Sequence, residues 1–127
     1  MKNIEKVKQE LSSNEYLRAA INMSNFLLVT DKDKNGTPIG ISPDMALELA
    51  KRLDLKLELI PYPSPGEIAD DAGNNKWDIC NIGAEPQRAE KINFSSAYAE
   101  IQATYLIQPG STIKSLEEVD LKGNRIS

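Results

Sequence analysis

The chain has 127 residues, of which 40% are hydrophobic and 27% charged, a composition typical of one globular domain with a single core. Its formal net charge of -4 argues against a nucleic-acid partner, because phosphate binding needs clustered Lys and Arg, which are scattered in this sequence. The absence of His and the single Cys80 exclude an internal disulfide, a His/Cys zinc site and catalysis by a Ser–His or Cys–His pair, so we expect no metal and no cofactor.

Residues 1–14 are predicted to form an N-terminal amphipathic helix. Ile4, Val7 and Leu11 recur at helical spacing with Lys and Glu between them. Packing on the domain is the simpler interpretation of this helix, and a partner-binding arm is the alternative. These residues lack the apolar core of a signal peptide, and apolar runs elsewhere are far shorter than the roughly 20 residues that span a bilayer.

Two short apolar runs, residues 16–21 and 26–29, have the length of strands. The polar segment at residues 31–37 follows them and contains the pair Asn35-Gly36, which is the strongest short hairpin signal. The pattern therefore predicts a strand, a loop, and then a hairpin.

Ser42 is the expected N-cap of a longer helix. Pro43 follows it at the first helical position, and apolar residues then recur at helical spacing to about Arg52. Residues 55–60 (LKLELI) alternate apolar and charged side chains, which is the pattern of a half-buried strand. Strand, helix and strand in succession favour a right-handed parallel crossover, so the predicted fold class is α/β.

Shorter elements complete the pattern. Residues 66–72 carry a weak helical signal and residues 77–82 (WDICNI) a strand signal, which together predict a second crossover. Residues 86–91 are expected to form a short helix that begins at Pro. Residues 99–108 (AEIQATYLIQ) are predicted to be a long strand that leaves the domain. The last segment predicts a short helix and then a strand that begins at Arg125, as at the start of a second domain.

The loops that follow strands are the first places to look for a ligand, because open α/β sheets bind ligands beyond the carboxyl ends of their strands. These loops are residues 22–26 and 83–88. The second offers backbone NH groups at an expected helix start and Arg88, whose planar guanidinium suits a carboxylate such as that of an amino acid. Glu85 beside Arg88 has a simpler interpretation as a surface salt bridge. Phe26 could stack on a ligand or pack in the core.

Five segments are distinctive in their order and spacing: LRAAIN, NGTPIGISPDMALELAKRL, KWDICNIGAEPQRAEKINFSSAY, ATYLIQPGS and SLEEVDLKGNRIS. Together they resemble the bacterial extracellular solute-binding proteins of family 3, and the match covers roughly residues 15–127. Residues 40–45, 85–88 and 93–98 are similar to the family's helix start, its Thr-Pro-x-Arg element and its Asp-Phe-Ser-x-Pro-Tyr segment. The resemblance lies in the whole series of segments, not in one short motif.

The resemblance implies a periplasmic-binding-protein-like II lobe, α/β in class, with a mixed, mostly parallel sheet and flanking helices. It places the first ligand-binding lobe at residues 15–102, a crossover hinge strand at residues 103–111, and the truncated start of a second lobe at residues 112–127. Two such lobes are expected to close on a ligand around the hinge.

By the same resemblance, the chain is expected to be the substrate-binding component of an ABC transporter and not an enzyme. It would bind an amino acid or similar small polar solute and pass it to a membrane permease, in a periplasmic or extracytoplasmic location, with a cytoplasmic one left open by the missing signal peptide. Glu85 stands where Thr is usual, and Asn22 where Asp often meets a ligand ammonium. The expected ligand-binding residues are Asn22, Phe26, Asn81, Gly83, Ala84, Glu85 and Arg88.

Two alternatives share the implied fold. A cyclohexadienyl or arogenate dehydratase-like enzyme would use Glu85 as an acid and Arg88 as a carboxylate clamp, whereas a sensory ligand-binding module would be attached to a membrane kinase. A single lobe supplies only half of a cleft and exposes surface that is normally covered, so weak binding and self-association of this chain are further expectations.

Overall fold

The computed structural model describes residues 3–11, 13 and 15–125. The chain divides into two compact units, Met1–Ser95 and Ser96–Ser127. All the strands that the structure describes belong to the first unit, as do all the ligand-binding residues expected from the sequence. In the described part of the chain, no helix combines the length and apolar character needed to cross a bilayer.

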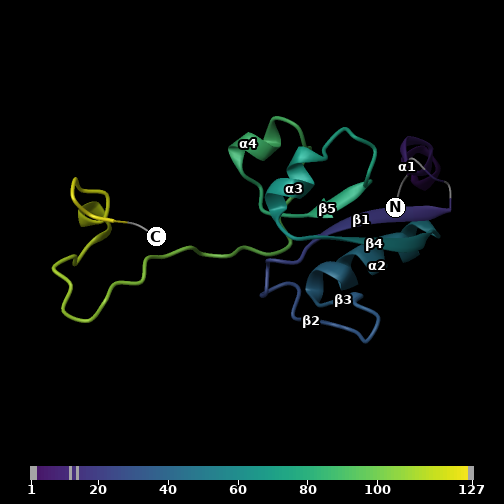
Figure 1. The fold of residues 1–127 in the computed structure, drawn as a ribbon. Coiled ribbons are helices and arrows are strands. Elements are labelled where there is room, and N and C mark those ends of the chain that lie inside the picture. Colours follow the sequence, from purple (N-terminus) through teal and green to yellow (C-terminus); the bar gives the residue numbers. More distant parts are fainter. Residues whose placement is uncertain (1–2, 12, 14, 126–127) are drawn as a thin grey trace. The chain divides into compact units, whose positions relative to one another are not determined.

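A three-stranded parallel sheet with strand order β4–β1–β5 forms the centre of the first unit (Figure 1). The strands are β1 at Tyr16–Asn22, β4 at Lys56–Tyr62 and β5 at Ile79–Asn81. Ala19 of β1 lies opposite Leu59 of β4 on one side and Ile79 of β5 on the other. Both predicted parallel crossovers are therefore confirmed, and the chain passes first to one side of β1 and then to the other.

Alternate side chains of β1 pack on opposite faces of this sheet. The covering helices are α2 at Ile41–Leu53 and α3 at Pro65–Asp70. Leu17 and Ile21, which are fully buried, belong to the clusters that include α2. Ala20 packs on the other face with Ile68 of α3. Burial of each Leu or Ile side chain contributes about 1.5–3 kcal/mol, so both faces of β1 hold the three layers together.

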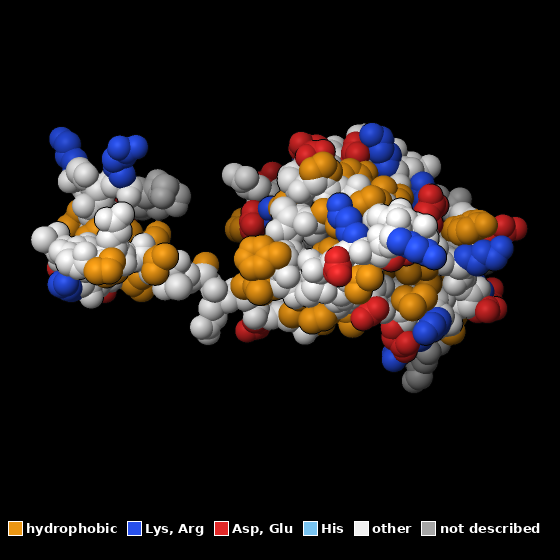
Figure 2. All heavy atoms as spheres, turned by 60° about the horizontal axis from the view of Figure 1, so that its bottom comes forward, with side chains coloured by type: hydrophobic (Ala, Val, Ile, Leu, Met, Phe, Trp, Pro, Cys, Tyr) orange, Lys and Arg blue, Asp and Glu red, His pale blue; other side chains and the backbone are white. Residues whose placement is uncertain are grey.

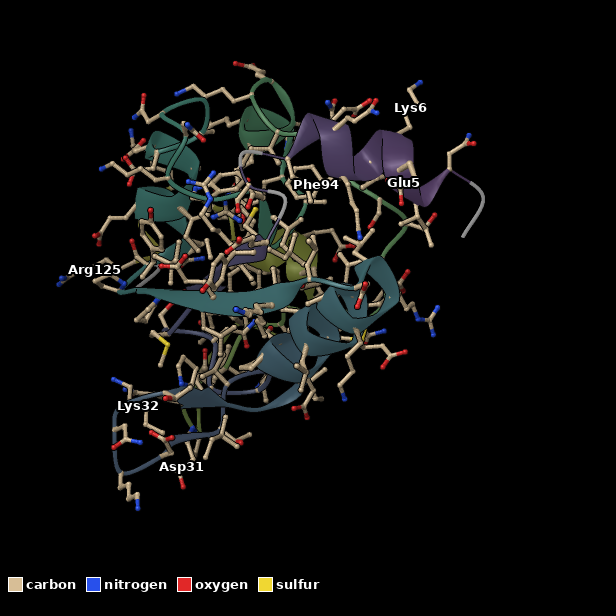
Figure 3. All side chains as sticks on the ribbon, turned by 90° about the vertical axis from the view of Figure 1, so that its right-hand side faces the viewer. Glu5, Lys6, Asp31, Lys32, Phe94 and Arg125 are labelled. Atoms are coloured by element: carbon tan, nitrogen blue, oxygen red, sulfur yellow. The ribbon has the colours of Figure 1, made fainter. Side chains whose placement is uncertain are left out.

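Helix α1 (Ile4–Glu10) packs on the first unit by one edge only. Ile4 and Leu11 contact the buried cluster around Leu17, whereas Glu5 and Lys6 are exposed (Figure 3). This arrangement is the amphipathic pattern expected from the sequence, and it agrees with the interpretation of α1 as a helix packed on the domain.

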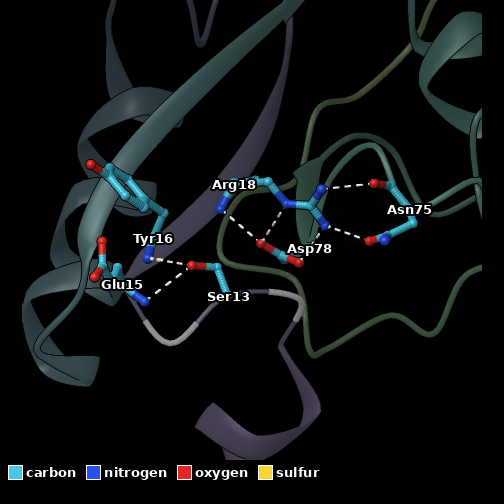
Figure 4. Close-up of polar contacts among 6 residues, drawn as sticks. All are labelled: Ser13, Glu15, Tyr16, Arg18, Asn75 and Asp78. Atoms are coloured by element: carbon cyan, nitrogen blue, oxygen red, sulfur yellow. Dashed lines mark hydrogen bonds and ion pairs between the residues drawn. The ribbon is translucent and has the colours of Figure 1, made fainter.

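A charged cluster joins the amino end of β1 to the segment before β5 (Figure 4). The guanidinium of Arg18 donates from Nε and Nη2 to the two carboxylate oxygens of Asp78, at 3.1 and 2.9 Å, and from Nη1 to the carbonyl oxygen of Asn75. The backbone NH of Arg18 also donates to Asp78. The Asp78 side chain is 4% exposed. These contacts fix β5 beside β1, and they join residues 60 positions apart, so the sequence gives no local signal of them.

Helix α2 begins two residues earlier than the sequence predicted. Its N-cap is Gly40, and Ser42 is buried within the first turn of the helix. Gly40 has φ +145°, and a Cβ atom there would lie 2.5 Å from the carbonyl oxygen of Leu28. Backbone packing against Leu28 therefore decides where α2 starts, and the expected Ser42 cap is wrong.

Residues 26–29, an apolar run of strand length, form a turn and not a strand. Asn25 organises it: its carbonyl oxygen accepts hydrogen bonds from the NH groups of Leu28 and Val29, and its side chain accepts one from Leu27. Val29 is buried in the core, although the segment has no strand partner. The apolar run thus supplies one buried core residue, Val29, and does not form a strand.

The predicted hairpin is confirmed. Strands β2 (Asp31–Lys32) and β3 (Pro38–Ile39) pair antiparallel, and Asp31 and Lys32 are exposed (Figure 3). Gly36 occupies the turn with φ +83°. Asp33 accepts hydrogen bonds from the NH groups of Asn35 and Thr37, and these bonds, above all that from Thr37, lower its pKa.

The second unit contains one short 3-10 helix, η1 (Leu116–Glu118), which has a capping box formed by Ser115 and Glu118. The strand predicted at residues 99–108, including the expected hinge segment from residue 103, is not formed among the described residues. Its backbone finds no strand to pair with, and Leu106 is fully exposed. The strand expected from Arg125 extends into residues 126–127, which lie outside the described residues.

Candidate functional site

The candidate site lies where β1 and β5 end. Because the two strands are parallel neighbours, Asn22 and Asn81 close them at the same edge of the sheet. The chain leaves β1 to reach β4 on one side and later returns to β5 on the other. Reversals of this kind open a crevice beyond the carboxyl ends of the strands, and ligands of α/β sheets bind there.

Asn22 shapes the loop that follows β1. Its side chain is almost fully buried, and Oδ1 accepts hydrogen bonds from the backbone NH and the hydroxyl of Ser24, at 3.1 and 2.8 Å. The next NH, that of Met23, donates to the carbonyl oxygen of Tyr62 at the end of β4. Asn22 therefore orients the loop through its own hydrogen bonds.

Asn81 connects the end of β5 to the start of α2. Its Nδ2 donates to the carbonyl oxygen of Ser42 at 3.2 Å, and the NH of Ser42 donates to the carbonyl oxygen of Leu28. The loop after β1 and the end of β5 thus meet at the first turn of α2. The sequence analysis treated Ser42 only as a cap, because residues 39 positions apart give no local signal of contact.

Phe26 projects from the loop after β1 and is 78% exposed. The core position considered for this residue is therefore wrong. Neighbouring turn hydrogen bonds around Asn25 hold the loop while leaving the ring in solvent. An exposed aromatic ring near the carboxyl edge of the sheet is available for stacking on a ligand.

Arg88, Glu85 and Gly83 come together between β5 and α4 (Pro86–Ala89). Nη1 of Arg88 donates to the carbonyl oxygen of Gly83 at 3.0 Å and lies 3.0 Å from Oε1 of Glu85. The Arg88 side chain is only 16% exposed, whereas that of Glu85 is 60% exposed. Within the described residues, Nε and Nη2 of Arg88 make no hydrogen bond, so one edge of the guanidinium is open to a carboxylate.

Helix α4 itself contributes little to anion binding. It has only four residues, so few peptide dipoles align in it. Its first NH groups should therefore attract an anion less strongly than the charge of Arg88 does. Ala84 is exposed in the loop before α4. The Arg88 guanidinium is therefore the cationic group of this loop.

A pocket of about 250 Å³ includes Glu85 and Arg88 in its wall. Asn22, Phe26 and Asn81 do not line it, so the structure divides the expected ligand residues between this pocket and the edge of the sheet. Helix α3 also contributes to this pocket, and its weak helical pattern in the sequence gives no reason to connect it with α4. The full lining is Gly66, Ala69, Asp70, Glu85, Gln87, Arg88 and Lys91.

Arg88 also acts on the end of the sheet electrostatically. Burial raises the pKa of the Cys80 thiol in β5 to about 11, and the positive charge of Arg88 offsets part of this effect. The thiol is therefore protonated at neutral pH, which excludes Cys80 as a ready nucleophile.

No group of three or more Cys, Asp or Glu side chains in the described residues is arranged to hold a metal ion. On the face drawn in Figure 2, Lys and Arg side chains lie among Asp and Glu side chains, without a broad basic patch.

Comparison with known families places this geometry in context. The family model described as "Bacterial extracellular solute-binding proteins, family 3" matches residues 17–123, most of the chain. A search of curated proteins found no significant match.

Several solved structures share the fold of the chain. An ancestral cyclohexadienyl dehydratase (TM-score 0.61, 23% identity) is matched over 78% of this chain and 39% of its own length. A mutant of the arginine-bound domain 1 of TmArgBP (0.60, 22%) is matched over 76% and 71%. An ancestral cationic amino acid solute-binding protein (0.58, 26%) is matched over 74% and 39%. The chain therefore spans about two fifths of the dehydratase and of the ancestral binding protein.

Proposed function

The chain belongs to family 3 of the bacterial extracellular solute-binding proteins, and from this premise we propose that it binds an amino acid or a similar small polar solute for an ABC importer. A permease in the membrane would receive the solute, and the binding step would take place outside the cytoplasm. The names of two similar structures, one bound to arginine and one described as a cationic amino acid binding protein, support an amino-acid-like ligand.

The geometry of Arg88 is the observation that carries this proposal. Its guanidinium is largely buried and is held from one side by the Gly83 carbonyl oxygen and by Glu85, while its Nε–Nη2 edge makes no hydrogen bond within the described residues. A carboxylate accepts two parallel hydrogen bonds from such an edge. Because the side chain is already ordered, binding loses little conformational entropy.

We further propose that residues 15–102 form one wall of the binding cleft, with residues 103–111 leading toward a second lobe. Asn22 and Asn81 would shape this wall at the end of the sheet, and Phe26 would stack on the ligand.

The test is an NMR titration of the isotope-labelled chain with L-arginine, L-glutamine and L-phenylalanine. Binding should shift the amide signals of residues 81–91 and the side-chain Nε–H signal of Arg88. Arg88→Ala should weaken binding by about 10- to 100-fold, the equivalent of a lost charge-assisted hydrogen bond.

Arg52→Ala is the matched control, because Arg52 on α2 pairs with Glu48 at 2.9 Å just as Arg88 pairs with Glu85, but both side chains are mainly exposed and lie outside the pocket. Equal losses in the two variants, or no binding of any of the three amino acids, would contradict the proposal.

We propose binding without catalysis. In the dehydratase-like alternative Glu85 would serve as a general acid, a role usually given to a carboxyl group whose proton is retained by burial. Glu85 is 60% exposed, so it does not have the buried position that this role requires. Incubation with prephenate should therefore give no dehydrated, decarboxylated product above the buffer rate.

A further inference from the structure

Glu85 and Arg88 form a pair whose geometry is set by the backbone. Glu85 is the N-cap of α4 and Arg88 lies three positions later in the same helix. Arg88 Nη1 is positioned 3.0 Å from both the Gly83 carbonyl oxygen and Glu85 Oε1. The Glu85 carboxylate is therefore held at one end of the guanidinium, while the Nε–Nη2 edge stays open.

A carboxylate that binds this open edge would lie on the same guanidinium as Glu85. Arg88 then carries one positive charge between two carboxylates, and the two carboxylates repel each other across a short distance in a partly buried site. If the carboxylate is the only charged group of the ligand, nothing offsets its repulsion by Glu85. A ligand with a cationic group next to its carboxylate relieves the repulsion, because the cation can contact Glu85.

The charges of the residues that line the pocket also favour a ligand with a cationic group next to its carboxylate. Asp70 and Glu85 are balanced by Arg88 and Lys91, so the four side chains sum to zero formal charge. An anion would leave the occupied pocket with a net negative charge. A zwitterion leaves it neutral, with its carboxylate toward Arg88 and its cation toward Glu85.

We propose that Glu85 determines specificity by selecting ligands whose carboxylate is adjacent to an ammonium group, over carboxylates without one. The inference rests on the proposed function, since it assigns a second contact to the same site. An α-amino acid fits because one carbon atom separates its two charged groups, so that both groups can reach the Glu85–Arg88 pair. Glu85 is mainly exposed, and this exposure leaves its carboxylate accessible to the ammonium.

The simpler alternative is that Glu85 and Arg88 form a surface ion pair without a role in recognition. Exposed pairs of this kind contribute little to stability. The low exposure of Arg88, the Gly83 carbonyl contact and the pocket distinguish this pair from the Arg52–Glu48 pair, in which both side chains are more than half exposed. That second pair is therefore the natural internal reference.

The experiment compares matched ligands by NMR titration of the whole chain. The probes are L-phenylalanine with L-phenyllactate, and L-alanine with L-lactate, in which a hydroxyl replaces the ammonium. Wild type should bind each amino acid about tenfold more tightly than its hydroxy acid. Glu85→Gln should reduce this ratio to about twofold or less, mainly by strengthening hydroxy-acid binding, whereas Glu48→Gln should leave it unchanged.

The possible outcomes separate the two proposals. If both members of a pair bind but the ratio stays the same in Glu85→Gln, Glu85 does not select the ammonium, while the proposed solute binding stands. A wild-type preference for the hydroxy acids also overturns the inference. If no amino acid and no hydroxy acid binds wild type, the proposed function fails and this inference fails with it. Glu85 makes no capping hydrogen bond, so the Gln variant should fold normally.

Discussion

Asn81 at the end of β5 donates a hydrogen bond of 3.2 Å to the carbonyl oxygen of Ser42 in the first turn of α2. This bond connects the sheet to the helix at the carboxyl edge, where the candidate site lies. Its two residues are separated by 39 positions, so it forms only when the crossover is complete. The wall of the site therefore depends on a tertiary contact as well as on its loops.

Asn81→Ala should lower the free energy of unfolding by about 1 kcal/mol, the usual net value of one partly buried hydrogen bond. The measurement is urea unfolding followed by the fluorescence of Trp77, which packs in the core cluster on the α3 face. Asn93→Ala is the control, since Asn93 is exposed and makes no hydrogen bond within the described residues. Equal effects of the two substitutions would show that the bond to Ser42 contributes nothing.

Asp78→Ala should lower the free energy of unfolding more than Asn81→Ala does, because it leaves the partly buried Arg18 guanidinium without its main partner. We expect a loss of about 3 kcal/mol, at the lower end of the range for breaking a buried ion pair. Glu48→Ala breaks an exposed pair and should cost less than about 1 kcal/mol. A loss for Asp78→Ala as small as that of the control would mean that the cluster at Arg18 does not hold β5 in place.

Gly40→Ala should lower the free energy of unfolding much more than Gly83→Ala. At Gly40 a Cβ atom would meet the Leu28 carbonyl oxygen at 2.5 Å, and φ is +145°. The combined strain and clash should cost about 2–4 kcal/mol. At Gly83 the contact with Arg88 Nη1 would be an ordinary 3.5 Å, so the unfolding free energy should change by less than about 1 kcal/mol. Similar losses at the two positions would contradict the close approach at Gly40.

Asp71 should contribute to the acid dependence of stability. Its hydrogen bonds with Lys76, at 3.1 Å, and with the hydroxyl of Tyr62, at 2.9 Å, lower its pKa in the folded chain. A carboxyl group with a lowered folded pKa stabilises the protein above its unfolded pKa of about 3.9, and this contribution is lost as pH falls through the folded pKa.

Asp71→Asn should therefore lower the free energy of unfolding at pH 7, and the difference from wild type should shrink as pH falls below about 4. Lys76→Ala should reproduce part of this pH-dependent difference, because Lys76 is the largest cause of the shift. Urea unfolding measured from pH 3 to pH 7 gives the result. A difference between wild type and Asp71→Asn that is constant over this range would show that the carboxylate charge is not responsible.

Local patterns account for the parts of the fold that the sequence predicted well. The alternation in residues 55–60 marks β4, and Asn35-Gly36 marks the hairpin turn, because each signal comes from neighbours in the chain. The spacing of Glu85 and Arg88 likewise predicted a possible ion pair, since three positions along a helix bring side chains together. Interactions between near neighbours in the chain can therefore be predicted from the order of the residues.

The features that the sequence did not predict depend on distant residues. The start of α2 at Gly40 is set by the backbone of Leu28, and the Arg18–Asp78 contact joins residues 60 positions apart. Residues 99–108 have the composition of a strand, but strand formation requires a partner to pair with. The composition of a segment indicates which secondary structure it can form, and tertiary contacts decide whether that structure forms.

Cys80 provides a direct measure of the electrostatic environment behind Arg88. Burial raises the pKa of the thiol to about 11, so at pH 8 only about one thousandth of the thiol is ionised. Alkylation by iodoacetamide should be slow at pH 7 and should rise about tenfold per pH unit through pH 9 without levelling off. Arg88→Ala removes the charge that lowers this pKa and should slow the reaction further, whereas Arg52→Ala should not. A rate that levels off near pH 8.5, or a faster reaction in Arg88→Ala, would mean that Cys80 is solvated and that Arg88 does not lie close enough to influence it.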